Sequence, residues 1–562
     1  MPTLHFKGKP LVQNHHLVVP FSELEAVKSR GVSPAGAGPS LHDNLIIEGD
    51  NLKALKALLP VYHGKVKCIY IDPPYNTGNE KWIYNDRVNS PMMRDWLGRT
   101  VDRDDLTRHD KWCCMMLPRL KLLRELLAPD GIIAVSIDDN EVANLCELLD
   151  EVFLPERRLA VAPWKAEPSG GKQKKGLRVG HEYLVIYHNG DDSNVSREEL
   201  STGELNLKDE QGKYRKGREL RKWGQGSLRI DRPDSWFDLV APDGTKVFPY
   251  RNDGKEGRWR WGKAGKMKPV VENPKLAHWE KVSYDEGVQV KGQTERWVPF
   301  EKVRDRRRSF GWSTWLDSFG FNSDGTREIK EIFGEKVFDT VKPTELLKWL
   351  ISLHTDEGAI ILDSTAGSGT TAHAVLALNK EDDGNRRFIL CQMPYETKEQ
   401  EQKEENICES ITAERVRRVI KGVKGARDES LREGLGGTFS YFRLGKELRK
   451  QAILDGKDLP SYEALAGYVF FTATGDELEP KKMNPPFIGT SRDRDVFLIY
   501  EQDIEKLKDM ALNLDLARKL GKAERKKLVF APTKYLDQEY LDRLNIEFCQ
   551  LPFEIYQRAT KK

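Results

Sequence analysis

The stretch VKCIYIDPPYNTG, residues 66–78, joins a mostly apolar, β-branched run to a turn with two consecutive prolines. Proline fixes its own φ and has no N–H to offer a sheet, so the pattern predicts a strand that ends in a rigid loop. This loop holds a carboxyl group, a carbonyl group and an aromatic ring together. Such groups suit a planar ring that carries an amine, because its N–H groups need acceptors and its face needs a stacking partner. The alternative is an ordinary turn in which Tyr75 packs and Asp72 caps.

Strands and helices alternate on both sides of this turn. The sequence predicts, in order, a strand at 45–47, a helix at 50–59, a helix at 112–127, a strand at 132–137, a helix at 140–152 and a strand at 183–187. The alternation resumes with a helix at 344–354, a strand at 359–363, a helix at 370–379 and a strand at 387–391. We therefore expect two α/β halves of one sheet.

A glycine-rich loop follows the strand that ends at Asp363. It reads Ala366-Gly367-Ser368-Gly369-Thr370-Thr371 and leads into the next helix. Glycines let a ligand approach the backbone, and a helix N-terminus offers free N–H groups and positive potential. The spacing is not G-x-G-x-x-G and no lysine follows, which disfavours a phosphate loop and leaves an adenosyl ligand with an amino-acid tail. The alternative is a tight turn that needs glycine for its geometry.

Length and composition exclude several classes of protein. A chain of 562 residues is too long for one core and predicts roughly three or four units. No uninterrupted apolar stretch approaches the roughly 18 residues of a membrane span, so we expect no membrane role. Seven scattered cysteines without a C-x-x-C pair suit a reducing compartment, which predicts a cytoplasmic protein without a structural zinc site.

Positive charge is concentrated in one segment. Residues 212–310 carry 25 Lys and Arg against 14 Asp and Glu, while the whole chain has a net charge of only +3. Six tryptophans are interleaved with these cations, which favours binding of a nucleic acid through phosphate contacts and base stacking. The alternative is a solvated basic face over a small tryptophan-rich core. The candidate DNA-binding residues are Arg258, Arg260, Arg306, Arg307 and Arg308.

These features divide the chain into five predicted parts. Residues 1–40 form a flexible lead-in, 41–189 the catalytic half of the α/β domain, 190–330 an inserted recognition module, 331–425 the cofactor-binding half, and 438–562 a small C-terminal α/β domain. The insertion is expected to be mostly β or irregular, because its segments are short and rich in glycine and proline.

Taken together, the two motifs resemble those of a β-class DNA amino-methyltransferase, in which the catalytic motif precedes the cofactor motif. His109-x-x-Trp112, Met116, Arg119-Leu120, Leu126-Leu127, Asp130-Gly131 and Ser136 to Glu141 follow the order of that family. More narrowly, the chain is similar to the modification subunits of type III restriction-modification systems. The resemblance implies a doubly wound, Rossmann-like methyltransferase sheet that is circularly permuted.

The resemblance also implies which residues form the site. The catalytic group is Asp72, Pro73, Pro74 and Tyr75. The group implied to bind S-adenosyl-L-methionine is Asp50, Asp72, Lys342, Asp363, Ala366, Gly367, Ser368, Gly369, Thr370, Thr371 and Glu396. Asp50 and Lys342 have alternatives as a helix N-cap and a helix start, and Gln392 is a polar substitute for Glu396. Thr365 stands where family members usually carry an aromatic residue.

The chemistry expected of this turn is methyl transfer to an amine. The Asp72 carboxylate and the Pro73 carbonyl are placed to accept the two N–H groups of an exocyclic amine, and Tyr75 to stack on a flipped base. In-line transfer needs positioning and requires no metal. Methylation of cytosine C5 is disfavoured, since it needs a cysteine nucleophile, usually after proline, and the chain has no Pro-Cys dipeptide.

Adenine N6 in double-stranded DNA is the expected target, because cytosine-N4 enzymes of this class more often resemble Ser-Pro-Pro-Tyr. The alternatives are cytosine N4, an RNA or protein amine, and a recognition subunit that mainly positions a nuclease. The resemblance suggests a homodimer and a restriction (helicase-nuclease) subunit as partner.

Overall fold

The computed structural model describes residues 3–33, 38–77, 107–170, 176–190, 195–200, 204–304, 308–356, 358–395, 398–447, 459–491, 494–503, 506–507, 510–521 and 524–551. They belong to two compact units, which are Met1–Ser196 with Ser313–Lys562, and Arg197–Trp312. The first unit contains the predicted α/β sheet, and the second contains most of the basic segment.

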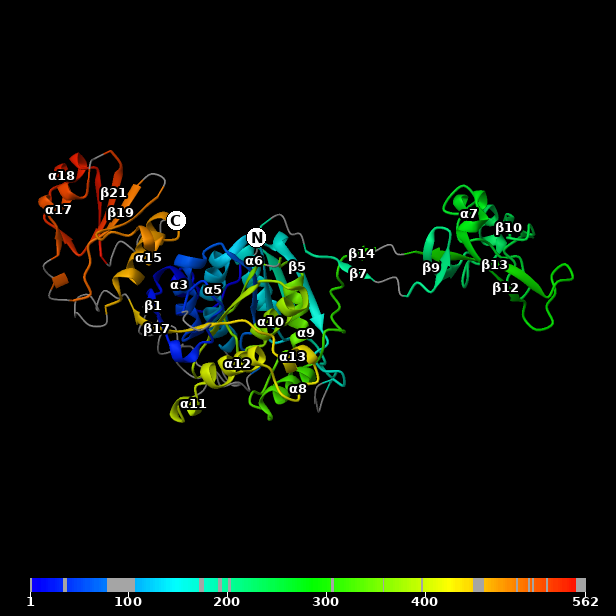
Figure 1. Cartoon of the computed structure of the whole chain (residues 1–562), viewed down its shortest axis with the longest axis horizontal. Coiled ribbons are helices and arrows are strands. Elements are labelled where there is room, and N and C mark those ends of the chain that lie inside the picture. The colour runs from blue at the N-terminus through cyan, green and yellow to red at the C-terminus, as the bar shows by residue number, and fades with distance from the viewer. Residues whose placement is uncertain are drawn as a thin grey trace. The chain divides into compact units, whose positions relative to one another are not determined.

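A nine-stranded sheet forms the centre of the first unit (Figure 1). Its strands, in spatial order, are β1 (Ser22–Ala26), β17 (Ser440–Glu447), β2 (Leu45–Glu48), β16 (Arg387–Gln392), β15 (Ile360–Asp363), β3 (Val66–Ile71), β4 (Leu127–Ile137), β6 (Glu182–His188) and β5 (Arg158–Trp164). The six strands from β17 to β4 are parallel. At the edges, β1 runs antiparallel to β17, and β6 runs antiparallel to both β4 and β5.

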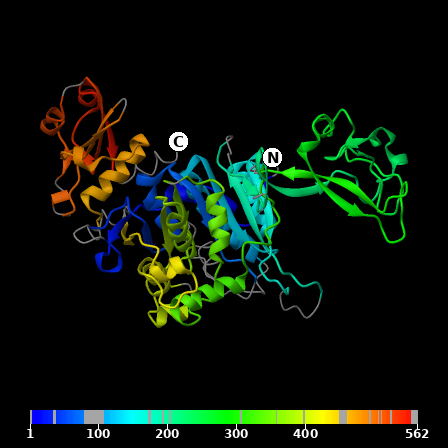
Figure 2. The same cartoon turned by 45° about the vertical axis from the view of Figure 1, so that its right-hand side comes forward.

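Helices cover both faces of this sheet (Figure 2). α3 (Asn51–Tyr62), α5 (Arg108–Leu126) and α6 (Val142–Phe153) share one hydrophobic core with the sheet. α9 (Thr344–Ser352) packs against α10 (Thr370–Asp382), which in turn contacts α12 (Glu414–Lys421). The parallel strands are accordingly buried on both faces, as Leu45, Ile46 and Ile47 illustrate. This arrangement confirms the doubly wound α/β fold.

The strand order reverses between β15 and β3. From β15 the chain passes through α10 to β16 on one side, whereas from β3 it passes through α5 to β4 on the other. In such sheets, ligands bind in the crevice outside the carboxyl ends of the strands at this switch point. Asp363 pairs with Tyr70, so the loops that follow the two strands begin side by side. Because β3 precedes β15 in the chain, the predicted circular permutation is confirmed.

Three predicted boundaries are wrong. Residues 1–40 are not simply a flexible lead-in, because β1 pairs with β17 and Val12 and Val19 are buried in the main core. Only residues 31–40 have the glycine- and proline-rich composition of a linker, and part of that stretch lies outside the described residues. The second boundary is residue 438, since β17 (Ser440–Glu447) belongs to the large sheet through its pairing with β2. The third is residue 330, because the inserted unit ends at Trp312 and the chain from Ser313 belongs to the first unit.

The C-terminal part of the first unit has its own small sheet. Its strands are β18 (Phe487–Thr490), β19 (Arg494–Leu498), β21 (Lys526–Ala531) and β23 (Ile546–Gln550). The accompanying helices are α15 (Tyr462–Thr474), α17 (Leu514–Lys519) and α18 (Gln538–Arg543). This mixture of strands and helices confirms the predicted small α/β module.

The second unit is built mainly of strands. Its largest sheet contains β12 (Ala277–Ser283), β13 (Glu295–Val303), β9 (Gly212–Glu219) and β8 (Leu207–Asp209). A short helix, α7 (Lys268–Glu272), precedes β12 in the chain. None of the helices in the described parts of the two units is long and apolar enough to cross a membrane.

Candidate active site

The catalytic turn is anchored from two sides. The backbone N–H of Asp72 donates to the hydroxyl of Thr365, at 2.8 Å, in the loop that follows β15. The indole N–H of Trp112 on α5 donates to the Pro74 carbonyl at 2.7 Å. Thr365, where the sequence departs from the family pattern, therefore connects the glycine loop directly to the catalytic turn.

A buried carboxylate supports the residue that follows the turn. Asn76 has a left-handed backbone, with φ of 58°, and its amide donates to Glu141. Glu141 is fully buried and also contacts His109 Nδ1 at 2.6 Å and Asn144 Nδ2 at 2.8 Å. Burial raises the pKa of Glu141, against hydrogen bonds that favour its ionised form. The sequence motif contained Glu141, but its contact with Asn76 was not predicted.

Lys342 lies between two carboxylates at the centre of the site. Its ammonium donates to Asp72 Oδ2 at 2.8 Å and lies 3.4 Å from Glu182 Oε2. Glu182, on β6, also accepts from the Tyr75 hydroxyl at 2.8 Å and from Asn322 Nδ2 at 3.0 Å. The ammonium is 5.2 Å from the centre of the Tyr75 ring, within the range of a cation–π contact. Glu182 was not among the predicted site residues. Lys342 and Asp72 were both predicted, and the structure brings them into contact.

The pKa values follow from burial and from these ion pairs. Burial alone would lower the pKa of Lys342, but Asp72 and Glu182 outweigh it and raise the pKa. Burial alone would raise the pKa of Glu182, but the charge of Lys342 and three hydrogen bonds lower it. Burial and the charge of Asp72 raise the pKa of Tyr75 well above its usual value. The tyrosine hydroxyl is therefore protonated at neutral pH and remains a donor to Glu182.

One oxygen of Asp72 has no partner among the residues that the structure describes. Asp72 Oδ1 is buried and accepts no hydrogen bond, whereas Oδ2 is held by Lys342. A buried acceptor without a donor costs about 1–3 kcal/mol. A ligand that brings an N–H group to Oδ1 would recover this free energy, so the carboxylate is suited to receive an amine.

The glycine loop has the geometry of a ligand cradle. Gly367 and Gly369 have left-handed φ angles of 51° and 80°, and Gly369 is the N-cap of α10. The Gly367 N–H donates to Gln392 Oε1 at 2.7 Å, and the Ala366 N–H donates to the Cys391 carbonyl at 3.2 Å. Neighbouring β16 thus fixes the loop at the positive end of a 13-residue helix.

Several predicted cofactor residues contact one another. Asp363 is buried and accepts from the Thr371 hydroxyl at 2.5 Å and the Thr365 N–H at 3.0 Å. Burial raises the pKa of Asp363 to about 7.

At the start of α3, Asp50 accepts from the Lys53 N–H at 3.1 Å and caps the helix, which is the alternative considered from the sequence. Its neighbour Asn51 donates to the Ser364 carbonyl at 3.2 Å, which brings the start of α3 to the glycine loop. Glu396 lies outside the described residues.

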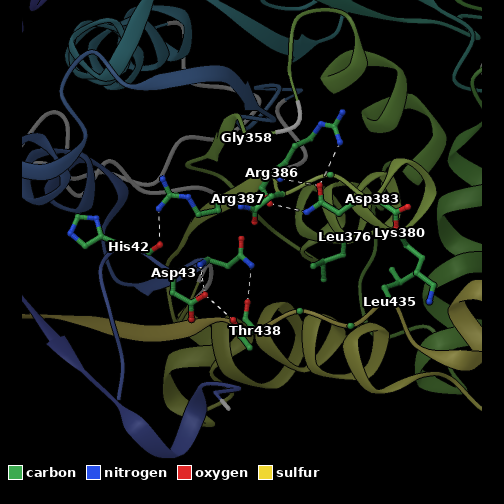
Figure 3. Close-up of a pocket in the computed structure, with 16 residues that line it drawn as sticks. His42, Asp43, Gly358, Leu376, Lys380, Asp383, Arg386, Arg387, Leu435 and Thr438 are labelled. Atoms are coloured by element: carbon green, nitrogen blue, oxygen red, sulfur yellow. Dashed lines mark hydrogen bonds between the residues drawn. The ribbon is translucent and has the colours of Figure 1, made fainter. Parts of the chain in front are cut away.

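The other end of the sheet holds a cavity of about 710 Å³ (Figure 3). It is lined by residues at the start of the parallel strands, including Asn44, Arg386, Arg387 and Thr438. These groups already bind protein atoms: Arg387 donates to the His42 carbonyl, and Asn44 to that of Thr438. The cavity is therefore separate from the two loops at the switch point, where the unsatisfied acceptor lies.

The second unit uses most of its tryptophans for packing. Trp259 is buried in a small core, with Trp261, Trp279 and Trp297 packed against it. Trp223 is 48% exposed, and the Arg221 guanidinium carbon lies 4.3 Å from the centre of its ring. The structure thus favours the tryptophan-rich core, the alternative to stacking, for the four packed rings.

The two predicted DNA-binding arginines in this core region contact backbone. Arg258 donates to the Gly226 and Trp259 carbonyls, at 2.6 and 3.2 Å, and Arg260 donates to the Glu219 carbonyl at 2.7 Å. Arg306 and Arg307 lie outside the described residues. Arg308 begins β14 (Arg308–Phe310), which pairs with β7 (Glu198–Leu200). Contact of any of these residues with DNA stays a prediction.

Comparison with known proteins agrees with these motifs. A family model described as DNA methylase matches residues 66–403. The chain is 32% identical over 450 residues to the type III restriction-modification enzyme StyLTI Mod subunit of Salmonella typhimurium, covering 76% of this chain and 64% of that protein. It is 35% identical over 355 residues to the type II methyltransferase M.KpnI of Klebsiella pneumoniae, covering 61% of this chain and 78% of that protein.

A further relative is the type III restriction-modification enzyme EcoP15I Mod subunit of Escherichia coli, which is 30% identical over 423 residues. That match covers 69% of this chain and 64% of the relative, so the chain spans less than two thirds of the length of both Mod subunits. The family match itself extends over more than half of the chain, and this chain belongs to the DNA methylase family.

Proposed function

We propose that the protein transfers a methyl group from S-adenosyl-L-methionine to the N6 amine of an adenine flipped out of double-stranded DNA. The observation that carries this proposal is the buried Asp72 Oδ1, an acceptor without a donor, on the loop beside the glycine loop. Relatives named as a methyltransferase and as modification subunits support the reaction class. We further propose that the protein is cytoplasmic, acts as a homodimer and has a restriction (helicase-nuclease) subunit as its partner.

The residues around the glycine loop fit the methyl donor. Gly369 lets the loop pack closely on Thr412, because a Cβ there would lie 3.1 Å from the Thr412 carbonyl and its left-handed φ favours glycine. The loop and the start of α10 would hold the amino-acid end through Ala366, Gly367, Ser368 and Thr370. Asp50, near the start of α3, would face the adenosine end. When bound, S-adenosyl-L-methionine supplies an electrophilic methyl group on a sulfonium.

The protein's own groups would make the amine nucleophilic. The lone pair of an adenine amine is delocalised into the ring, so it attacks poorly. Asp72 Oδ1 and the Pro73 carbonyl would accept its two N–H groups and direct the lone pair at the methyl group. As the N–C bond forms and the S–C bond breaks, one of these two protons would leave the nitrogen along its hydrogen bond. Lys342 holds Oδ2 of the same carboxylate, which leaves Oδ1 for the base. Tyr75 would stack on the flipped ring while its hydroxyl is held by Glu182.

The base and the polymer can be identified in one experiment. Purified protein is incubated with methyl-labelled cofactor and either duplex DNA or RNA, and the product is hydrolysed to nucleosides. We expect label in N6-methyladenine from DNA. Label only in N4-methylcytosine would replace adenine by cytosine as the target. DNA binding without any label would favour a recognition subunit that positions a nuclease.

Substitutions of Tyr75 should separate the aromatic face from the hydroxyl. Tyr75→Ala removes both, and we expect kcat/KM to fall about 10- to 100-fold because stacking is abolished. Tyr75→Phe keeps the ring and removes only the bond to Glu182, so the decrease should stay below about tenfold. Steady-state kinetics and the fluorescence of 2-aminopurine at the target position measure the two effects. Equal decreases in both variants would contradict stacking on Tyr75.

The arginine run should bind phosphates of the DNA backbone. Replacing Arg306, Arg307 and Arg308 by Gln is expected to weaken DNA binding. The slope of log K against log salt concentration should become shallower by about one for each phosphate that no longer has a cation beside it. A control variant removes three exposed cations of the C-terminal module, Lys481, Lys482 and Lys519. If both variants change the slope equally, or neither does, the arginine run does not bind the DNA.

A further inference from the structure

Arg415 is a fully buried cation behind the glycine loop. It lies on α12 with an exposed fraction of 0%, and its Nη1 donates to Thr370 Oγ1 at 2.7 Å and to Ser368 Oγ at 3.1 Å. Both hydroxyls belong to the motif that leads into α10. No sequence motif indicated Arg415, because it lies 45 residues beyond Thr370 in the chain.

The segment that carries Arg415 holds the loop at a second point. Thr412, three residues earlier, donates its hydroxyl to the Gly367 carbonyl at 2.5 Å. Hydrogen bonds from one short segment therefore reach Gly367, Ser368 and Thr370. Because Gln392 on β16 accepts from the Gly367 N–H, the peptide groups on both sides of Gly367 are fixed.

The charge of Arg415 is only partly compensated. Glu328 Oε2 forms a long ion pair with Nη2, at 3.5 Å, and that oxygen also accepts from the Thr344 hydroxyl at 2.6 Å. His373 Nδ1 is 3.2 Å from Nη2, and burial together with Arg415 lowers the pKa of His373 well below its usual value. The histidine is therefore neutral and adds no charge at this position. Burial lowers the pKa of Arg415 to about 10, which still leaves it a cation at neutral pH.

A buried charge of this kind is costly unless another charge compensates it. The N-terminus of α10 adds positive potential at the same place. The two contributions add at the glycine loop, where an anionic group would be stabilised. Of the two ends of the proposed cofactor, only the amino-acid end carries a carboxylate.

We infer that Arg415 is a positioning residue that clamps the glycine loop and supplies the positive potential for the carboxylate end of the cofactor. This inference rests on the proposed function, since it assumes an adenosyl ligand with an amino-acid tail. It assigns Arg415 no contact with the ligand. Its effect passes through Ser368 and Thr370 and through the electrostatic potential in a region of low dielectric.

Binding of two ligands by calorimetry tests the inference. S-adenosylhomocysteine carries the amino-acid end, whereas 5′-methylthioadenosine lacks it. We expect Arg415→Met to raise the Kd of S-adenosylhomocysteine by about tenfold or more, which corresponds to about 1.4 kcal/mol. The Kd of 5′-methylthioadenosine should change less than about threefold. Arg418→Met is the matched control, because Arg418 is on the same helix and bonds Glu414 and the Ile332 carbonyl instead.

Arg415→Lys keeps the positive charge and removes the forked hydrogen bonds of the guanidinium. This variant replaces Arg415→Met in the binding test if the methionine variant does not fold. It should weaken S-adenosylhomocysteine binding by about three- to tenfold and leave that of 5′-methylthioadenosine unchanged. Equal changes for both ligands, or no change in either, would overturn the inference. A wild-type protein that binds neither ligand would instead overturn the proposed function, so the two failures are distinguishable.

Discussion

Asp72→Ala is expected to lower kcat/KM for methyl transfer by at least about 10²- to 10³-fold. This is the decrease typical of removing one fixed polar group that stabilises charge in a transition state. The variant removes the Oδ1 acceptor, so one N–H of the amine has no partner and the lone pair is less well directed. Single-turnover kinetics with labelled cofactor measure the effect on the chemical step.

Asp72→Asn is the matched variant, because it keeps the shape and one carbonyl oxygen but removes the negative charge. We expect its activity to lie between those of the wild type and Asp72→Ala. DNA affinity, measured separately, should change little in either variant. If Asp72→Ala keeps wild-type turnover, the proposed role of the catalytic turn is wrong.

Lys342→Met is expected to change both stability and the pH dependence of activity. The substitution leaves Asp72 and Glu182 close together without their shared cation. Breaking a buried ion pair in this way costs about 3–5 kcal/mol of the free energy of unfolding. The cost should be largest at pH 7 and smaller at lower pH, where the Glu182 carboxylate can take up a proton.

The sign of the pH effect follows from Glu182. In the wild type its pKa is lowered, so its contribution to stability is present above pH 4.5, its ordinary value, and is lost as the pH falls through the lower folded value. Without Lys342, burial raises the pKa instead. The acidic limb of the profile of kcat/KM against pH should therefore move to higher pH.

A control for this variant is Lys348→Met on α9. Lys348 pairs with Glu345 and Glu381, both of which are more than half exposed, and none of the three belongs to the site. We expect the acidic limb of that variant to stay in place. Denaturant unfolding at pH 5 and pH 7, together with the two pH profiles, provides the comparison. An unmoved acidic limb in Lys342→Met would show that Lys342 does not control the site's charge.

Much of the central fold could be predicted from local patterns. The strand at 66–71, the helix at 344–352 and the glycine loop each have a sequence signature that a short window contains. Strands β1, β5 and β17 were missed, because they depend on pairing with other segments of the chain. β1 and β5 lie at the edges of the sheet, and β17 lies between β1 and β2. The arginines of the basic insertion were assigned to DNA from composition, which does not distinguish a cation that binds phosphate from one that binds a backbone carbonyl, as Arg258 does.

The features of the site also divide into those that the sequence predicts and those that depend on the tertiary structure. By itself, the sequence determined the two motifs, their permuted order and the groups that the catalytic turn offers to an amine, since each depends on adjacent residues. Only the tertiary structure decided that Lys342 bridges Asp72 and Glu182, and that Arg415 lies behind the glycine loop. These interactions join residues far apart in the chain, and the order of strands in the sheet brings them together. Burial at those positions then sets the pKa values, because the free energy of a charge depends on its three-dimensional surroundings.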